Sequence, residues 1–137
     1  MTRAIRFESF GGPEVLQYRE VEVPAPGEGE ARVAHRAIGV NFIDVYHRTG
    51  LYPLTLPSGL GGEGAGVVTA VGPGVRHLKA GDRVAYTAPA PLGSYSDERV
   101  VAVEQNVLAA KAQSELALRR RADDADDART ELARPLR

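Results

Sequence analysis

Polar and apolar residues alternate along several short stretches of the chain, and glycine or proline separates one stretch from the next. In residues 30–40, Ala31, Val33, His35 and Ala37 fall on one side of an extended backbone, and charged residues fill most of the other side. A period of two predicts a half-buried β-strand. Similar patterns predict strands at 2–8, 16–23, 66–71, 83–87 and 95–103, with turns at 11–13, 24–27 and 73–74. Many short strands at this spacing predict a mainly β fold, a small and partly open β-barrel.

One segment departs from the strand pattern. Asn41 is a residue type that caps helices, because its amide oxygen can accept a hydrogen bond from an early backbone N–H. Gly50 can end such a helix by adopting a left-handed conformation. The sequence therefore predicts a short helix after Asn41 that runs to about Thr49.

The composition changes sharply near residue 102. All 15 glycines lie between Gly11 and Gly93, and residues 109–137 consist almost entirely of Ala, Leu, Arg, Asp and Glu. We therefore predict a folded domain over residues 1–103 and a divergent tail over 104–137. A composition of this kind is typical either of a charged helix or of a disordered segment.

Charge and cysteine content limit the possible functions. The net charge is −1 and no long apolar run is present, which argues against nucleic-acid and membrane partners. The chain has no cysteine, which excludes disulfides, thiolate metal sites and a cysteine nucleophile. We expect a cytoplasmic protein.

Six motifs occur in a characteristic order along the chain. They are GGPEVL at 11–16, AIGVNFID at 37–44, YHRTGLYP at 46–53, PSGLGGEGAGVV at 57–68, VGPGV at 71–75 and KAGDRV at 79–84. Together they resemble the zinc-free NADPH:quinone oxidoreductases, which are zeta-crystallin-like members of the medium-chain dehydrogenase/reductase superfamily. The resemblance implies a GroES-like barrel that the full enzymes join to a Rossmann domain, NADPH as the cofactor, a quinone or activated enone as the substrate, and a homodimer.

The same resemblance implies that zinc is not used. Zinc-dependent members of the superfamily carry a cysteine at the position of Asn41 and a histidine at that of Gly62. The three histidines, His35, His47 and His77, lack the spacing of metal ligands. The glycines within residues 61–66 precede a strand-like stretch rather than a helix, so we expect them to serve close backbone approach and positive φ rather than phosphate binding.

The resemblance places Asn41 and Tyr52 beside the nicotinamide end of the cofactor. Asn41 would orient the nicotinamide or substrate, and Tyr52 would donate a hydrogen bond to the acceptor's carbonyl oxygen. Asp44 is a further catalytic candidate, and Tyr46 a further cofactor-binding candidate. Structural interpretations stand beside these: Asn41 as a helix cap, Asp44 as a favourable charge at a helix N-terminus, and both tyrosines as packing residues.

The resemblance fades after about residue 103, and we expect the Rossmann domain to be absent and the chain to be inactive by itself. Residues 119–126 have the character of GC-rich DNA translated out of frame, so we predict a frameshift near Leu118; the alternative is a genuine tail. Whether this chain is an enzyme stays open. The alternative function is a non-enzymatic GroES-like module for binding or association.

Overall fold

The computed structural model describes residues 1–87, 92–103 and 107–109. Strands dominate these residues, and they contain a single α-helix, α1 (Phe42–Thr49). The mainly β fold predicted from the sequence is confirmed. None of the helices in this part of the chain is long and apolar enough to cross a membrane. The prediction for the charged tail falls on residues outside the described ranges, apart from the strand β8 (Val107–Ala109).

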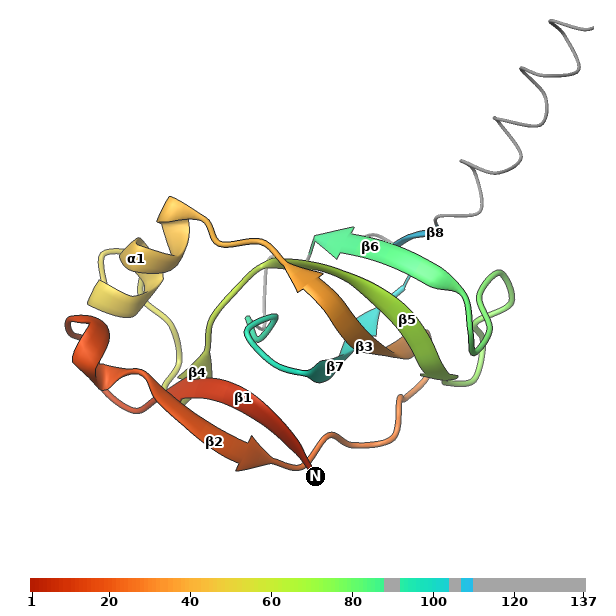
Figure 1. The fold of residues 1–137 in the computed structure, drawn as a ribbon, viewed down its shortest axis with the longest axis horizontal. Coiled ribbons are helices and arrows are strands. Elements are labelled where there is room, and N and C mark those ends of the chain that lie inside the picture. The colour runs from red at the N-terminus through yellow and green to blue at the C-terminus, as the bar shows by residue number, and fades with distance from the viewer. Residues whose placement is uncertain (88–91, 104–106, 110–137) are drawn as a thin grey trace, which may run out of the picture.

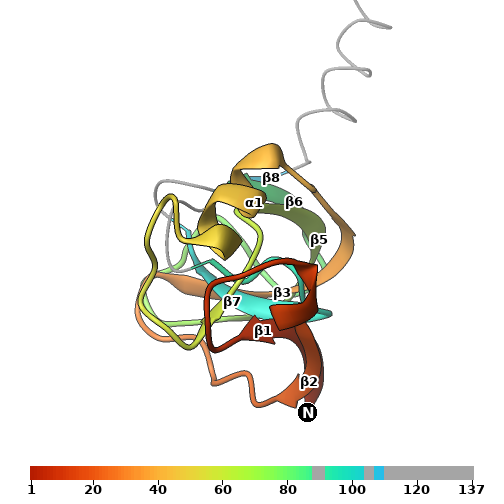
Figure 2. The same ribbon diagram turned by 90° about the vertical axis from the view of Figure 1, so that its left-hand side faces the viewer.

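A small antiparallel sheet has the strand order β2-β1-β4, with β2 at Gln17–Val21, β1 at Thr2–Phe7 and β4 at Ser58–Gly59. A short 3-10 helix, η1 (Pro13–Val15), lies in the connection between β1 and β2. The side chain of Arg48 in α1 donates to the carbonyl of Gly11 at 2.6 Å, and the N–H of Gly11 donates to the carbonyl of Arg48 at 3.1 Å. These bonds hold the end of α1 against this connection, above the β1–β2 hairpin (Figures 1 and 2).

A larger antiparallel sheet has the order β7-β3-β5-β6-β8, with β7 at Glu98–Ala102, β3 at Glu30–Ile38, β5 at Glu63–Val71 and β6 at Arg83–Thr87. A bridge between Ala4 and Ser96 links the two sheets. In the described part of the chain the sheets do not close, so the prediction of a partly open barrel is confirmed.

The hydrophobic core lies on the inner face of the larger sheet. Val33 and Ala31 of β3 are fully buried and pack with Val68 of β5, which is 1% exposed. The rest of the cluster comes from β6, β7 and the neighbouring turns: Leu78, Val84, Tyr86, Val101 and Val103. Burial of these apolar side chains holds β3, β5, β6 and β7 together.

The predicted strands agree with the observed strands in part. Residues 83–87 form β6 as predicted, whereas β5 begins at Glu63 and β7 at Glu98 rather than at 66 and 95. The pairing of β3 with β5 shifts between Arg32 and Val33 and again between His35 and Ala37. The second shift breaks the alternation, and Ala37 is exposed rather than buried on the Val33 side.

Candidate functional site

The site is built around the N-terminus of α1. Asn41 is the N-cap residue, in an extended conformation (φ −121°, ψ 151°), and Gly50 ends the helix with φ 83°. Both features were predicted from the sequence. Asn41 and Asp44 form a capping box, in which the Asp44 carboxylate accepts the backbone N–H of Asn41 at 2.9 Å.

Asp44 is a buried carboxylate that is only half satisfied. Its side chain is 5% exposed, and Oδ2 accepts both the Asn41 N–H and the hydroxyl of Tyr95, at 2.9 Å in each case. Oδ1 is shielded from solvent and has no hydrogen-bond partner among the described residues. Burial, followed by the hydrogen bond to Asp44 and the charge of that carboxylate, raises the pKa of Tyr95. Tyr95 therefore remains a neutral hydroxyl donor that fixes the orientation of Asp44.

The side chain of Asn41 reaches across to the larger sheet. Its amide nitrogen donates to Oε1 of Glu63, the first residue of β5, at 3.0 Å. The Glu63 carboxylate lies against the backbone of Gly39, where any Cβ would overlap it. Glu63 was not a candidate in the sequence analysis, because it lies inside a glycine-rich run that we assigned to backbone geometry.

A pocket of about 220 Å³ opens between α1 and the start of β5. It is lined by Asn41, Ile43, Asp44, His47, Gly62, Glu63, Thr87 and Leu92. Two of the predicted site residues, Asn41 and Asp44, thus share one pocket. Two carboxylates line it, and none of its lining residues within the described ranges is lysine or arginine.

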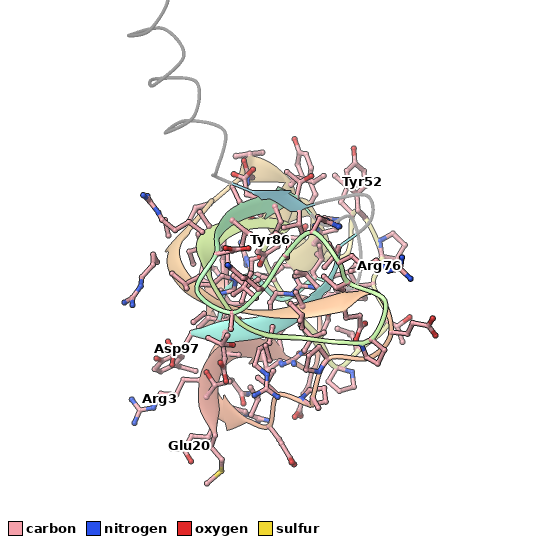
Figure 3. All side chains as sticks on the ribbon, turned by 90° about the vertical axis from the view of Figure 1, so that its right-hand side faces the viewer. Arg3, Glu20, Tyr52, Arg76, Tyr86 and Asp97 are labelled. Atoms are coloured by element: carbon pink, nitrogen blue, oxygen red, sulfur yellow. The ribbon has the colours of Figure 1, made fainter. Side chains whose placement is uncertain are left out.

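Tyr46 and Tyr52, the other predicted site residues, lie outside this pocket in an aromatic row beside it. The Tyr46 ring lies 5.2 Å from the ring of Phe42 and 5.4 Å from that of Tyr52, both edge to face. The Tyr52 ring also lies 6.1 Å from the imidazole of His47, which lines the pocket. Tyr52 is 49% exposed and points away from the body of the molecule (Figure 3). The row therefore continues the pocket wall toward solvent.

The glycine-rich stretch serves backbone geometry. Gly61 adopts φ 88°, and a Cβ at Gly66 would overlap the carbonyl of Ala34 on the neighbouring strand. Both features agree with the expectation that these glycines permit close approach and positive φ.

A second polar cluster lies inside the larger sheet. The His35 ring contacts the carbonyl of Ser96 through Nδ1 at 2.6 Å and the hydroxyl of Tyr86 through Nε2 at 2.7 Å. Tyr86 in turn shares a hydrogen bond of 2.9 Å with Oγ of Ser94, to which Arg99 donates at 3.4 Å. Figure 3 shows Tyr86 within the molecule. Burial lowers the pKa of His35 and raises that of Tyr86.

No group of three or more His, Asp or Glu side chains in the described part of the chain is arranged to hold a metal ion. His35 is engaged inside the larger sheet, His47 lines the pocket and His77 is exposed. The three histidines therefore lie in separate environments.

Comparison with known proteins shows which family the chain belongs to. A family model described as "Alcohol dehydrogenase GroES-like domain" matches residues 27–112. Quinone oxidoreductase of Pseudomonas aeruginosa is 57% identical over 108 residues, which cover 78% of this chain and 33% of the relative. Among solved structures, quinone oxidoreductase of Pseudomonas syringae gives a TM-score of 0.75 at 54% identity, covering 80% of this chain and 33% of that one. Escherichia coli quinone oxidoreductase complexed with NADPH gives 0.76 at 48% identity, covering 81% and 34%. The chain spans about a third of the length of these relatives.

Proposed function

Because this chain belongs to the alcohol dehydrogenase GroES-like family, we propose that it forms the substrate side of an oxidoreductase that transfers hydride from NADPH to a quinone or activated enone. Membership confirms the resemblance predicted from the sequence. The observation that carries the proposal is the pocket at the N-terminus of α1, in which Asn41 joins two carboxylates beside a row of aromatic rings.

The pocket fits one end of the proposed cofactor. NADPH supplies the hydride when it is bound. The planar faces and edges of Tyr46 and Tyr52 suit a flat ring, and the amide of Asn41 suits a carboxamide or a carbonyl oxygen. The pyrophosphate of the cofactor finds no cationic side chain among the pocket's described lining residues. We therefore propose that this chain contacts only the ring end and that tight binding needs a separate nucleotide-binding domain.

Each candidate residue has a chemical role in this proposal. Asn41, held by Glu63 at 3.0 Å, orients the ring or the acceptor. Tyr52 donates a hydrogen bond to the acceptor's oxygen, where negative charge develops as hydride arrives. Tyr46 packs against Tyr52 and sets the orientation of its ring. Asp44 accepts a hydrogen bond at Oδ1. We propose that zinc takes no part.

Turnover tests this proposal most directly in a chimaera. Residues 1–103 of this chain replace the matching segment of the Escherichia coli enzyme, and oxidation of NADPH by a quinone is followed by absorbance. We expect activity in the chimaera, and a decrease in kcat/KM of about tenfold or more for Asn41→Ala and for Tyr52→Phe. Tyr18→Phe is the matched control, because Tyr18 lies on β2 and is 61% exposed. Equal activity of all three variants would contradict the assigned roles.

A second candidate function is association without catalysis. Val40, Phe42 and Leu51 are 80%, 71% and 63% exposed, which is unusual for large apolar side chains around one helix. Such a surface favours contact with another protein or domain. Sedimentation of the purified chain separates the two functions: a tight oligomer that loses its affinity with Phe42→Ser would favour association.

A further inference from the structure

The pocket is lined by a carboxylate, Asp44, that has one hydrogen-bond acceptor without a donor. A carboxylate offers acceptor sites on both oxygens and no donor. In Asp44 both donors, the Asn41 N–H and the Tyr95 hydroxyl, approach Oδ2, and Oδ1 has no partner in the described part of the chain. A buried carboxylate oxygen without a partner is costly, because it has lost its hydration without gaining a hydrogen bond.

None of the other described lining residues donates a hydrogen bond to Oδ1. Glu63 is a second carboxylate and accepts from Asn41 through Oε1. His47 has an unpartnered Nδ1, which can present either a proton or a lone pair depending on its tautomer. Oδ1 of Asp44 is thus a buried acceptor to which none of the described lining residues donates, and the two carboxylates add negative charge, so the pocket favours a donor over an acceptor.

This asymmetry distinguishes the two redox forms of a quinone. A quinone has only carbonyl oxygens, which accept hydrogen bonds, whereas a hydroquinone has hydroxyl groups, which donate them. We propose that the pocket binds the hydroxyl-bearing, reduced form of an aromatic substrate more tightly than the quinone, through a hydrogen bond from a ligand hydroxyl to Oδ1 of Asp44. The inference rests on the proposed function, because it assumes that the ring of the substrate enters this pocket.

The pocket dimensions suit such a ligand. Its volume of about 220 Å³ is smaller than that of pockets for drug-sized molecules, about 300–1,000 Å³, so it accommodates a single ring. Oδ1 is shielded from solvent, so the proposal requires that an entering hydroxyl displaces a lining side chain. Ile43 is the candidate, because it lines the pocket and is 46% exposed.

A ligand series on the unmodified chain tests the preference. Hydroquinone, its monomethyl ether and its dimethyl ether share one ring but carry two, one and no hydroxyl groups. Each is titrated into ¹⁵N-labelled protein under argon with ascorbate, and amide shifts at Asn41 and Asp44 give the Kd. Because a hydrogen bond to a charged group is stronger than one between neutral groups, we expect the dimethyl ether to bind about tenfold or more weakly than the other two.

The substitution Asp44→Asn tests the acceptor itself. The carbonyl oxygen of the new amide is held toward the Asn41 N–H and the Tyr95 hydroxyl, so an NH₂ group takes the place of Oδ1. We expect this variant to lose the preference for hydroxyl-bearing ligands. Asp82→Asn is the matched control: Asp82 is 8% exposed and accepts the N–H of Lys79 at 3.0 Å, outside the pocket.

The outcomes separate this inference from the proposed function. If the three ligands bind here with equal Kd, the donor preference is wrong and the pocket remains a ring site. If Asp44→Asn keeps the preference, or Asp82→Asn loses it equally, Asp44 is not the acceptor. If none of the ligands shifts these amides, both the inference and the proposed function fail. Should Asp44→Asn not fold, as its amide spectrum will show, the ligand series alone decides.

Discussion

The hydrogen-bond chain inside the larger sheet should make the stability of this protein depend on the charge of His35. The carbonyl of Ser96 can only accept, so Nδ1 of His35 must donate to it. Nε2 of the neutral ring then accepts a hydrogen bond from the Tyr86 hydroxyl, with 2.7 Å between nitrogen and oxygen. The Ser94 hydroxyl donates to the Tyr86 oxygen, with 2.9 Å between the two oxygens. The positive charge of Arg99 lies at the end of this chain, 3.4 Å from Oγ of Ser94.

Protonation of His35 works against this arrangement. A proton on Nε2 forces Tyr86 to turn its own proton toward Ser94, and it places a second positive charge near Arg99. Burial is the largest cause that lowers the pKa of His35 below 6.5, and Arg99 lowers it further. The carbonyl of Ser96 and the carboxylates of Asp97 and Glu98 act in the opposite direction without reversing the shift. Stability from the neutral ring is therefore complete above pH 6.5 and is lost as the pH falls through 6.5 toward the folded pKa.

Proton linkage sets the size of the effect. One histidine that stays neutral in the folded state and titrates normally in the unfolded state lowers the free energy of unfolding by at most about 1.4 kcal/mol between pH 7.5 and 5.5. We expect urea unfolding to show a decrease up to this size in the wild type and a smaller decrease in His35→Gln, whose amide does not titrate. His77→Gln is the control, because His77 is exposed. An unchanged pH dependence in His35→Gln would refute this reasoning.

Three further substitutions test the packing that positions the site. Gly66→Ala places a Cβ against the carbonyl of Ala34, and we expect a loss of about 1–3 kcal/mol in urea unfolding; an unchanged midpoint would contradict the close approach. Gly39→Ala should displace the Glu63 carboxylate and shift the side-chain amide NMR signals of the N-cap asparagine; unchanged signals would contradict the contact between them. Phe7→Ala should lower the free energy of unfolding by about 3–5 kcal/mol, because Phe7 is 0% exposed. A loss under about 1 kcal/mol would mean that the neighbouring side chains fill the space that Phe7 leaves.

The sequence predicts this fold best where local chemistry decides the structure. The extents of β6 and α1 follow from alternation and from Asn41 and Gly50, residues whose preferences are local. The two residues of β4 pair with Arg6 and Phe7, far away along the chain, so no local period marks them. The bulge after His35 likewise depends on the partner strand β5, and this is why the predicted alternation ends there.

The site shows the same division. Asn41 and Asp44 are recognisable because they are neighbours in one motif, and the structure brings both to one pocket. Glu63 and Tyr95 become relevant only after folding, when β5 and the segment before β7 bring them to Asn41 and Asp44. The position of Glu63 among glycines was the one signal in the sequence that could have marked it as a site residue. The contact of Tyr95 with Asp44 has no local signal in the sequence.

The two interpretations of Asn41, helix cap and ligand contact, concern different atoms and therefore do not exclude each other. In the capping box the Asn41 side chain faces the backbone N–H of Asp44, whereas its amide nitrogen donates to Glu63. Asn41→Ser separates the two roles, because serine caps a helix about as well as asparagine but has no amide nitrogen. We expect the free energy of unfolding to change by less than about 0.5 kcal/mol. In the chimaera, turnover should fall as far as in Asn41→Ala. Loss of stability without loss of turnover would assign Asn41 to the cap alone.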